Sequence, residues 1–366
     1  MKNVLERMQE NNTRFKVATF IAKQKESYEF KVRYAEKTAW EFYENPEIAG
    51  QCYVAVGGLD SITLLLFLRS IGIDVPAISV SSLEDKSIQA IHKQIGVQAL
   101  KPIKSKIEVI REFGFPVLSK EIAGKISLLQ NPSEKNKTVR HAIITGETGE
   151  YGGFQKNSRM KMSQKWLEKF GGYENKNEGV NYAKPDFLVS DKCCYYLKEK
   201  PCNDYARESG RFPYMGLMAS EGGRRQKALM MHGCNYISKG TKRSCPFAIF
   251  SRQDLLQLAL DLNVPVPEIY GEIVRDSDGT LRTTKAQRTG CSMCGFGIHM
   301  EKRPHRFDLL YQTNQKEWDM WMNRVIQRED GSWYGWGHVL DYIGVEWQNP
   351  EIYEDDFQIS LEEVLQ

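Results

Sequence analysis

The stretch of residues 52–61 constrains the fold more than any other part of the chain. Its first five residues are apolar or aromatic, a glycine pair follows, and Asp60 and Ser61 lead into the apolar run 62–68. This order predicts a buried strand, a tight turn and the first turn of a helix. Glycine lets a backbone approach a ligand closely, and the N–H groups at a helix start suit an anionic oxygen such as phosphate. The same pattern also fits a plain helix cap made by Asp60 or Ser61.

Strand-like and helix-like segments alternate after this turn. Strands are predicted at 52–56, 75–81 and 97–102, and helices at 61–70, 83–95 and 105–113. Such alternation predicts a doubly wound α/β fold with a mostly parallel sheet and right-handed crossovers. Ligands of such sheets bind beyond the carboxyl ends of the strands, where the glycine turn and Ser81 are expected to lie.

The composition of the sequence and the spacing of its apolar residues divide the chain into three predicted regions. Residues 1–48 have apolar positions at helical spacing among charges, which predicts a helical N-terminal segment packed on the next domain. Residues 49–300 form the predicted α/β domain, with an insertion at about 131–190 that is rich in Gly, Asn and Lys. Residues 301–366 form a predicted helical, tryptophan-rich region, whose tryptophans favour a core over a cofactor site.

The net charge of +3 over 366 residues is too small to require a nucleic-acid partner. Within the insertion, however, cations and aromatic residues gather, and together they can bind single-stranded nucleic acid; a solvated excursion explains them equally well. These residues are Lys156, Arg159, Lys161, Lys165 and Lys169 with Phe154, Trp166 and Phe170. The polar N-terminus and the short apolar runs predict a cytoplasmic protein without a membrane partner.

The eight cysteines include two pairs, Cys193-Cys194 and the C-x-x-C of Cys291 and Cys294. If the fold brings these pairs together, they supply four thiolates for a metal. Adjacent cysteines suit a cluster, where each thiolate binds a different iron, better than they suit one zinc ion. The pattern therefore predicts a [4Fe–4S] cluster on these four residues, with zinc, or buried thiols without a metal, as the alternatives. Lys198, which follows the first pair, would offset the thiolate charge.

The glycine turn, the Lys-Cys-Cys-x-x-x-Lys segment at 192–198 and the later C-x-x-C together resemble the phosphoadenosine phosphosulfate reductase family, within the adenine-nucleotide α-hydrolase-like superfamily. Their order and spacing are similar to those of the cluster-bearing adenylyl-sulfate reductases, and the turn resembles the loop of the N-type ATP pyrophosphatases. The resemblance covers about residues 50–300. It implies an adenine nucleotide, either ATP or a sulfonucleotide, at the carboxyl edge of the sheet, beside the cluster.

The resemblance also implies the residues of the nucleotide site. Residues 57–61 would form the phosphate loop, and segment 216–225 resembles the part of the family that places a glutamate and arginines near the substrate phosphates. Arginine suits phosphate or sulfate because its guanidinium group donates two parallel hydrogen bonds. The alternative is that these arginines are simply solvated at the start of a helix. The predicted nucleotide-binding residues are Gly57, Gly58, Asp60, Ser61, Ser81, Glu221, Arg224 and Arg225.

The chain departs from the family at four places. Val56 and Leu59 stand where the pyrophosphatase loop has serine and lysine, which removes a cation from the phosphates, and Met218 stands where the family has its first arginine. No cysteine follows Cys294, whereas sulfonucleotide reductases carry a nucleophilic cysteine in a C-terminal Glu-Cys-Gly-type motif. Another thiol, such as Cys202, Cys234 or Cys245, would have to fold next to the nucleotide.

These observations favour an enzyme that uses a nucleotide to activate sulfur transfer, as in the related DNA-phosphorothioation and tRNA-thiolation proteins. The insertion at 131–190 would then hold the nucleic acid, and a separate protein would donate sulfur or electrons. One alternative is a sulfonucleotide reductase, an oxidoreductase that uses another cysteine or an external thiol. The other is a non-catalytic module that binds a nucleotide or a cluster, which Val56 and Leu59 support.

Overall fold

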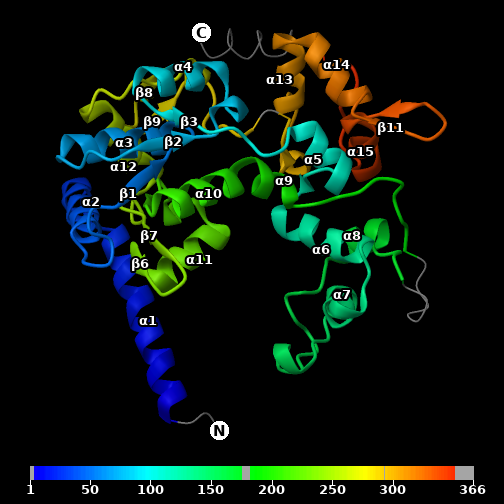
Figure 1. Ribbon diagram of the computed structural model, residues 1–366, viewed down its shortest axis with the longest axis horizontal. Helices are drawn as coiled ribbons and strands as arrows, with labels where there is room; N and C mark the ends of the chain where they lie inside the picture. The colour runs from blue at the N-terminus through cyan, green and yellow to red at the C-terminus, as the bar shows by residue number, and fades with distance from the viewer. Residues whose placement is uncertain (1–3, 175–181, 292, 351–366) are drawn as a thin grey trace. The chain divides into compact units, whose positions relative to one another are not determined.

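A computed structural model of the chain describes residues 4–174, 182–291 and 293–350, apart from the side chains of residues 4–11 and of Arg224. The chain forms two compact units, each built from two separate segments. Unit 1 comprises residues 1–102 and 198–292, and unit 2 comprises residues 103–197 and 293–366. Unit 1 therefore combines the blue and cyan N-terminal elements with green and yellow elements from later in the chain (Figure 1).

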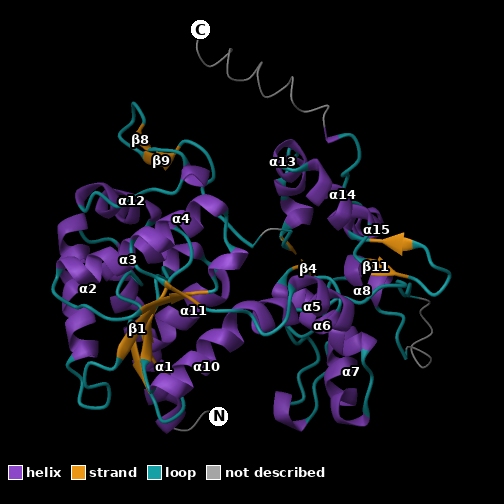
Figure 2. Ribbon diagram, turned by 45° about the horizontal axis from the view of Figure 1, so that its top comes forward, coloured by secondary structure: helices purple, strands orange, loops and turns teal. Residues whose placement is uncertain are grey.

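The centre of unit 1 is a six-stranded sheet in the order β3-β2-β1-β5-β7-β6 (Figure 2). Five strands run parallel, and only the edge strand β6 runs antiparallel to its neighbour β7. The strands are β1 Cys52–Ala55, β2 Ala77–Ser79, β3 Gln98–Ala99, β5 Phe212–Tyr214, β6 Asn235–Ile237 and β7 Lys242–Ser244. The predicted doubly wound α/β fold with a mostly parallel sheet is thereby confirmed.

The order of the strands reverses next to β1. From β1 the chain passes through helix α3 to β2 and then to β3 on one side. After its excursion through unit 2, the chain returns through α10 to β5, which pairs with the other side of β1, with Val54 opposite Tyr214. The loops that follow β1 and β5 therefore diverge at their carboxyl ends, the place where open α/β sheets bind ligands.

Seven α-helices of the described part of unit 1 accompany this sheet, and the views show α3 on one side of it and α10 and α11 on the other (Figures 1 and 2). Their bounds are α1 Val4–Gln24, α2 Tyr28–Tyr43, α3 Leu59–Ser70, α4 Lys86–Gln94, α10 Lys200–Ser209, α11 Gly223–His232 and α12 Arg252–Asp261. Two of these helices, α1 and α2, fill most of the segment predicted to be helical at the N-terminus. A hairpin of β8 Ile273–Arg275 and β9 Leu281–Thr283 follows α12.

The core of unit 1 surrounds α3, because its apolar run leaves no polar face. Ile62, Leu64 and Leu65 are fully buried together with Val54 of β1 and Phe247. None of the helices that the structure describes combines the length and the apolar character needed to cross a bilayer.

Unit 2 has a mainly helical, aromatic core. The fully buried Trp336 packs edge-on against Phe115, with ring centroids 5.0 Å apart, and lies against Gly295, where a Cβ atom would come within 2.4 Å of the indole. Its elements are α5 Lys106–Phe113, β4 Val117–Leu118, α6 Lys120–Gln130, α7 Lys137–Thr145, α8 Gln164–Phe170, α9 Lys192–Cys194, β10 Gly295–Phe296, α13 Arg306–Thr313, α14 Gln315–Asn323, β11 Ile326–Gln327, β12 Trp333–Tyr334 and α15 Trp336–Ile343. A π-helical turn, Tyr195–Glu199, follows α9.

The boundaries of the two units differ from those of the three regions predicted from the sequence. Helix α5 belongs to unit 2, and most of the predicted insertion at 131–190 supplies part of the unit 2 core. Trp166 and Phe170 are buried there, because their apolar side chains pack against each other and against α15. The predicted C-terminal region contributes Trp321 and Trp336 to this core, with Trp318 and Trp347 packed against it, whereas Trp333 is exposed. Residues 351–366 lie outside the described residues.

Candidate functional site

A pocket of about 380 Å³ opens in unit 1 at the carboxyl ends of β1 and β5. Most of its lining comes from three stretches: the turn after β1, the segment after β5, and the segment that follows the β8–β9 hairpin. The lining residues are Ala55, Gly57, Gly58, Leu59, Asp60, Ser61, Glu84, Lys198, Met215, Gly216, Leu217, Glu221, Arg225, Tyr270, Gln287, Arg288 and Thr289. The switch point of the sheet thus carries the pocket, as the topology requires.

The Ser61 side chain holds the glycine turn in shape and does not cap helix α3. The Gly57 N–H donates to Ser61 Oγ at 2.7 Å, and the Ser61 hydroxyl donates to the Gly58 carbonyl at 3.0 Å. Gly58 takes the N-cap position of α3, and no side chain caps the helix there. The alternative that Asp60 or Ser61 merely caps this helix is therefore wrong.

Two positions at the turn have no room for a side chain. A Cβ atom on Gly58 would lie 2.2 Å from the Tyr270 hydroxyl oxygen. A Cβ atom on Gly216, in the loop after β5, would lie 3.0 Å from the Asp60 carbonyl oxygen. Gly58 thus makes room for the Tyr270 side chain, whereas Gly216 lets the loop after β5 pack against the backbone of Asp60 and Ser61.

The Tyr270 side chain lies against the N-terminus of α3. Its hydroxyl accepts the Leu59 N–H at 3.2 Å and is hydrogen-bonded to Thr289 Oγ1 at 2.7 Å. Burial raises the pKa of Tyr270, so the hydroxyl stays neutral. The N–H groups of Gly57 and Leu59 are thus satisfied by hydroxyls of the chain itself, and an anion at this turn has to compete with them.

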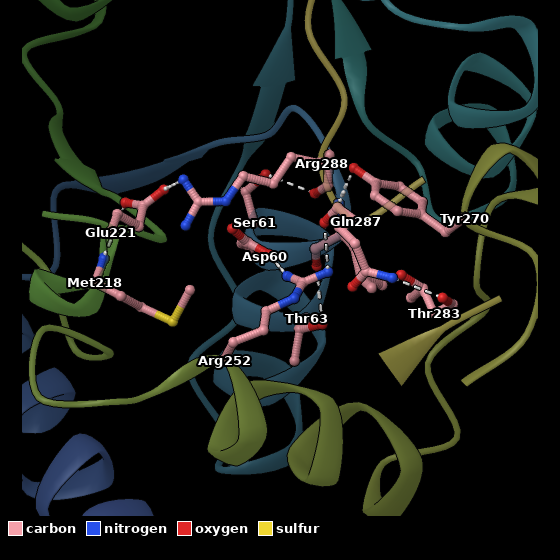
Figure 3. Close-up of polar contacts among 12 residues, drawn as sticks. Asp60, Ser61, Thr63, Met218, Glu221, Arg252, Tyr270, Thr283, Gln287 and Arg288 are labelled. Carbon is pink, nitrogen blue, oxygen red and sulfur yellow. Dashed lines mark hydrogen bonds and ion pairs between the residues drawn. The ribbon is translucent and has the colours of Figure 1, made fainter. Parts of the chain in front are cut away.

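Asp60 points toward α12, where it forms an ion pair with Arg252 (Figure 3). Arg252 also donates to the Gln287 carbonyl at 3.0 Å, which ties the segment after the β8–β9 hairpin to the pocket. Burial raises the pKa of Asp60 more than the charge of Arg252 lowers it.

Two arginines converge on one carboxylate at the opposite rim. Glu221, whose side chain is 5% exposed, forms an ion pair with Arg225 and a second one, at 3.5 Å, with Arg288. Both guanidinium groups are more than half exposed, and Figure 3 shows Arg288 reaching toward Glu221 across the pocket. One positive charge is therefore left over at this rim, where it can attract an anionic ligand.

A third cation stands beside the glycine turn. Lys198 Nζ pairs with Glu84 Oε1 at 2.6 Å and is hydrogen-bonded to the Cys291 sulfur. Burial lowers the pKa of Lys198, but the charges of Cys291 and Glu84 raise it more, so the amine keeps its proton. Glu84 borders the turn, because a Cβ atom on Gly57 would contact its carboxylate at 3.7 Å.

His92 holds the backbone of the glycine turn through the Gly57 carbonyl. Its Nε2 lies 2.7 Å from the Gly57 carbonyl and its Nδ1 lies 2.9 Å from Ser81 Oγ. Since a carbonyl only accepts, Nε2 carries the hydrogen and Nδ1 accepts from the Ser81 hydroxyl when the ring is neutral. Burial lowers the pKa of His92, which favours that neutral ring.

This arrangement predicts a pH dependence of stability. Because burial lowers the pKa of His92 in the folded state, the unfolded chain takes up the proton first. Stability conferred by the neutral ring is thus present above about pH 6.5 and is lost as the pH falls below that value. The substitution His92→Gln keeps an N–H for Gly57 and should flatten this decline. Melting temperatures of both proteins, measured down to about pH 5.5, check the prediction, and parallel curves would contradict it.

The structure gathers most of the predicted nucleotide residues in the pocket. Gly57, Gly58, Asp60, Ser61, Glu221 and Arg225 line it. Ser81 is not among the lining residues and supports His92 instead, and the side chain of Arg224 lies outside the described part of the chain. Sequence reasoning did not assign Glu84, Lys198, Tyr270, Gln287, Arg288 or Thr289 to this site, and only Lys198 had a signal, as the lysine after the cysteine pair.

The four cysteines of the predicted cluster are divided between the units. Cys291 belongs to unit 1, whereas Cys193, Cys194 and Cys294 belong to unit 2. Among the residues that the structure describes, no group of three or more His, Cys, Asp or Glu side chains is placed to hold a metal ion. The [4Fe–4S] cluster, with zinc as the alternative, therefore stays a prediction.

The remaining cysteines are poor nucleophiles. Burial raises the pKa of Cys52 to about 12, that of Cys234 to about 11 and that of Cys245 to about 12. Burial also raises the pKa of Cys202, which is not among the pocket-lining residues. None of these thiols replaces the C-terminal nucleophile that the reductases carry.

No protein-family model matches the chain, and no curated protein matches it. Among solved structures, the chain is similar to the phosphoadenylyl-sulfate (PAPS) reductase from Candida auris, solved as a phosphate complex, at 12% sequence identity and a TM-score of 0.35. The similarity covers 67% of this chain and 89% of that one. This TM-score is too low to carry an argument about the chain, so the relation to that family remains a resemblance of motifs.

Proposed function

We propose that unit 1 binds an adenine nucleotide in the pocket at the switch point and uses it to activate sulfur transfer. The observation that carries the binding proposal is the pair Arg225 and Arg288, which share the single carboxylate of Glu221 at the rim. The choice of adenine and of sulfur chemistry rests on the resemblance of the motifs.

The anionic end of the nucleotide would lie at the arginine rim. Each guanidinium can form two parallel hydrogen bonds to a phosphate or sulfate, and both are exposed enough to be reached. Leu59 brings no cation to the glycine turn, whose Gly57 and Leu59 N–H groups already have partners. The charge of the ligand would therefore be balanced mainly by Arg225 and Arg288, because Lys198 is already paired with Glu84.

In the proposed reaction an oxygen of the acceptor attacks the α-phosphorus of ATP, and pyrophosphate leaves. The outer sulfur of a persulfide donor then displaces AMP, which leaves the acceptor joined to the donor through a disulfide. A second thiol of the donor attacks this disulfide, so that the acceptor is released with sulfur in place of its oxygen and the donor is left oxidised to a disulfide. The chain would contribute by positioning the nucleotide and by stabilising the charge that builds up on the departing phosphates. Arg225 and Arg288, which line the pocket, would provide that stabilisation.

A second candidate, sulfonucleotide reduction, is favoured by the contact of Cys291 with the pocket-lining Lys198. In this reaction the thiolate attacks the sulfur of the sulfonucleotide and the sulfur–oxygen bond to the phosphate breaks. The nucleotide leaves with that oxygen, and the cysteine becomes an S-sulfonate. An external dithiol then releases sulfite and is itself oxidised to a disulfide.

A panel of ligands tests both candidates. Thermal shift with ATP, adenylyl sulfate and phosphoadenylyl sulfate identifies the ligand, because a ligand at one hundred times its dissociation constant adds about 2.7 kcal/mol of stability. Release of pyrophosphate supports sulfur transfer, and release of sulfite supports reduction. Binding without either product would make unit 1 a non-catalytic nucleotide-binding module, and no shift with any of the three would contradict the proposal.

Removing the hydroxyl that competes at the turn should improve binding. In Tyr270→Phe the Leu59 N–H loses its internal acceptor and becomes available to the ligand. We expect between about twofold and tenfold tighter nucleotide binding, with unfolding made easier by about 0.5–1.5 kcal/mol. Fluorescence titration with a labelled nucleotide and urea denaturation measure the two effects. Unchanged or weaker binding would show that the anion does not use this N–H.

The predicted cluster has a separate test. If Cys291 is a ligand, Cys291→Ala should lose iron and melt at a lower temperature, because metal binding is coupled to folding. Anaerobic purification with a visible spectrum and with iron and zinc analysis measures this loss, and Cys202→Ala, a thiol outside both pairs, is the matched control. Colourless wild-type protein containing zinc would overturn the iron–sulfur prediction, and wild-type protein containing neither metal would overturn both.

A further inference from the structure

The loop between α7 and α8 in unit 2 has a fixed shape that does not depend on its aromatic side chains. We call residues 146–158 the aromatic loop. The Ser158 N–H donates to the Gly146 carbonyl at 2.9 Å and closes the base of the loop. Inside it, Thr148 Oγ1 accepts the Gln155 N–H at 2.8 Å and donates to the Gly152 carbonyl at 2.9 Å.

This loop presents two aromatic rings to solvent. Tyr151 is fully exposed and Phe154 is 73% exposed, whereas Trp166 and Phe170 of the neighbouring helix α8 are buried in the core. Phe154 also has a φ of 47°, in the left-handed region that bulky residues rarely adopt. Because its side chain is exposed and its backbone is strained, Phe154 does not stabilise unit 2. Residues with strained backbones are typical of binding sites.

Four cations follow these rings, and no acidic residue lies between them; Glu147 and Glu150 of the loop precede Tyr151. From residue 151 to residue 167 the chain contains no Asp or Glu. The four cations in this stretch, Lys156, Arg159, Lys161 and Lys165, are all exposed. A Cβ atom on Gly146 would lie 3.4 Å from both the Lys156 carbonyl oxygen and the Lys161 side chain, so these two segments meet at the base of the loop.

We propose that the aromatic loop binds single-stranded nucleic acid. Tyr151 and Phe154 would stack on unpaired bases, and Lys156, Arg159, Lys161 and Lys165 would neutralise the phosphates. Duplexes fit less well because their bases are already stacked on one another. The proposal concerns binding by unit 2 and does not depend on the pocket of unit 1. It also revises the hypothesis drawn from the sequence, because Trp166 and Phe170 are excluded and Tyr151 is added.

The test is an anisotropy titration of the full chain with fluorescent oligo(dT) and oligo(U), which separates DNA from RNA as the ligand. Phe154→Gly removes the ring at a backbone position that suits glycine. We expect a loss of affinity of between about fivefold and a hundredfold, with an unchanged or raised melting temperature. Phe15→Ala, which removes an exposed ring from α1 of unit 1, is the matched control and should bind as the wild type does.

Salt dependence tests the cations. The slope of log K against log salt should become shallower by about 1.4 in Lys156→Gln/Lys161→Gln, since each phosphate contact to a single strand contributes about 0.7. The proposal is overturned if the wild type binds neither oligomer, if Phe154→Gly binds as tightly as Phe15→Ala, or if the slope does not change. It is also overturned if a duplex or polyglutamate competes as well as the single strand does. The variant Arg225→Gln/Arg288→Gln should bind the oligomers normally, which separates this proposal from the pocket.

Discussion

Replacing Arg225 and Arg288 together with glutamine is expected to weaken nucleotide binding at least about a hundredfold, since a hydrogen bond to a charged group contributes about 1.5–3 kcal/mol. The two guanidinium groups supply the uncompensated charge at the rim, and Glu221 alone would repel the ligand once both are neutral. The fold should persist, because both side chains are more than half exposed. Equilibrium binding of a fluorescent ATP analogue measures the loss.

The matched control is Arg275→Gln/Arg282→Gln. These arginines lie in the β8–β9 hairpin of the same unit, outside the pocket lining, and their removal changes the net charge by the same amount. The control should bind the nucleotide within about twofold of the wild type, because neither arginine lines the pocket and salt screens exposed charges that do not contact the ligand. An equal loss in both variants would show a general effect of charge, and no loss in either would remove the arginine rim from the site.

Replacing Lys31 with methionine is expected to lower the free energy of unfolding by about 3–5 kcal/mol, because it leaves a buried carboxylate without its partner. Lys31 Nζ of α2 lies 2.9 Å from Asp254 Oδ2 of α12, and these side chains are only 8% and 10% exposed. Asp254 also accepts from the N–H and the hydroxyl of Ser251 at the start of α12, so its charge is fixed in place. Urea denaturation at neutral pH measures the change.

Lys37→Met is the control on the same helix. Lys37 and Glu41 are 3.6 Å apart and both exposed, so this variant should lose at most about 0.5 kcal/mol. Lys31→Met/Asp254→Leu should recover part of the stability by removing the stranded charge, although it also loses the cap of α12. If Lys31→Met were no less stable than Lys37→Met, the ion pair between α2 and α12 would not hold the core of unit 1 together.

The sequence predicted β1 and α3 well because their signals are local. Five apolar residues, a glycine pair and an apolar run correspond to Cys52–Ala55, the turn and Leu59–Ser70. Strand β2 was also predicted, although it is shorter than the apolar run suggested, because only Ala77–Ser79 pairs with neighbours. The parallel sheet followed from the alternation of strands and helices.

The other half of the sheet had no such signal. Strands β5 and β7 have only three residues each, and they contain Pro213 and the charged residues Lys242 and Arg243. Strand β5 forms because β1 offers an unpaired edge, which the chain reaches only after its excursion through unit 2, and β7 then pairs with β5. The switch point, and with it the position of the pocket, is thus a tertiary property that local patterns do not contain.

The same distinction applies to the site. The glycine turn and Asp60 followed from local pattern, and Glu221 and Arg225 from the resemblance. Tyr270 lies 211 residues from the Leu59 N–H that it occupies, and no pattern around it indicates this role. A glycine turn in a sequence therefore does not show whether its N–H groups are open to a ligand, because a distant side chain can satisfy them.

Calorimetric titration of the wild-type chain with ATP and with adenylyl sulfate tests the central claim, nucleotide binding by the switch-point pocket, most directly. The account predicts one site per chain for at least one of the two ligands, with a dissociation constant below about 100 µM that rises with added salt. Absence of saturable heat for both ligands at about ten times that concentration would contradict the claim.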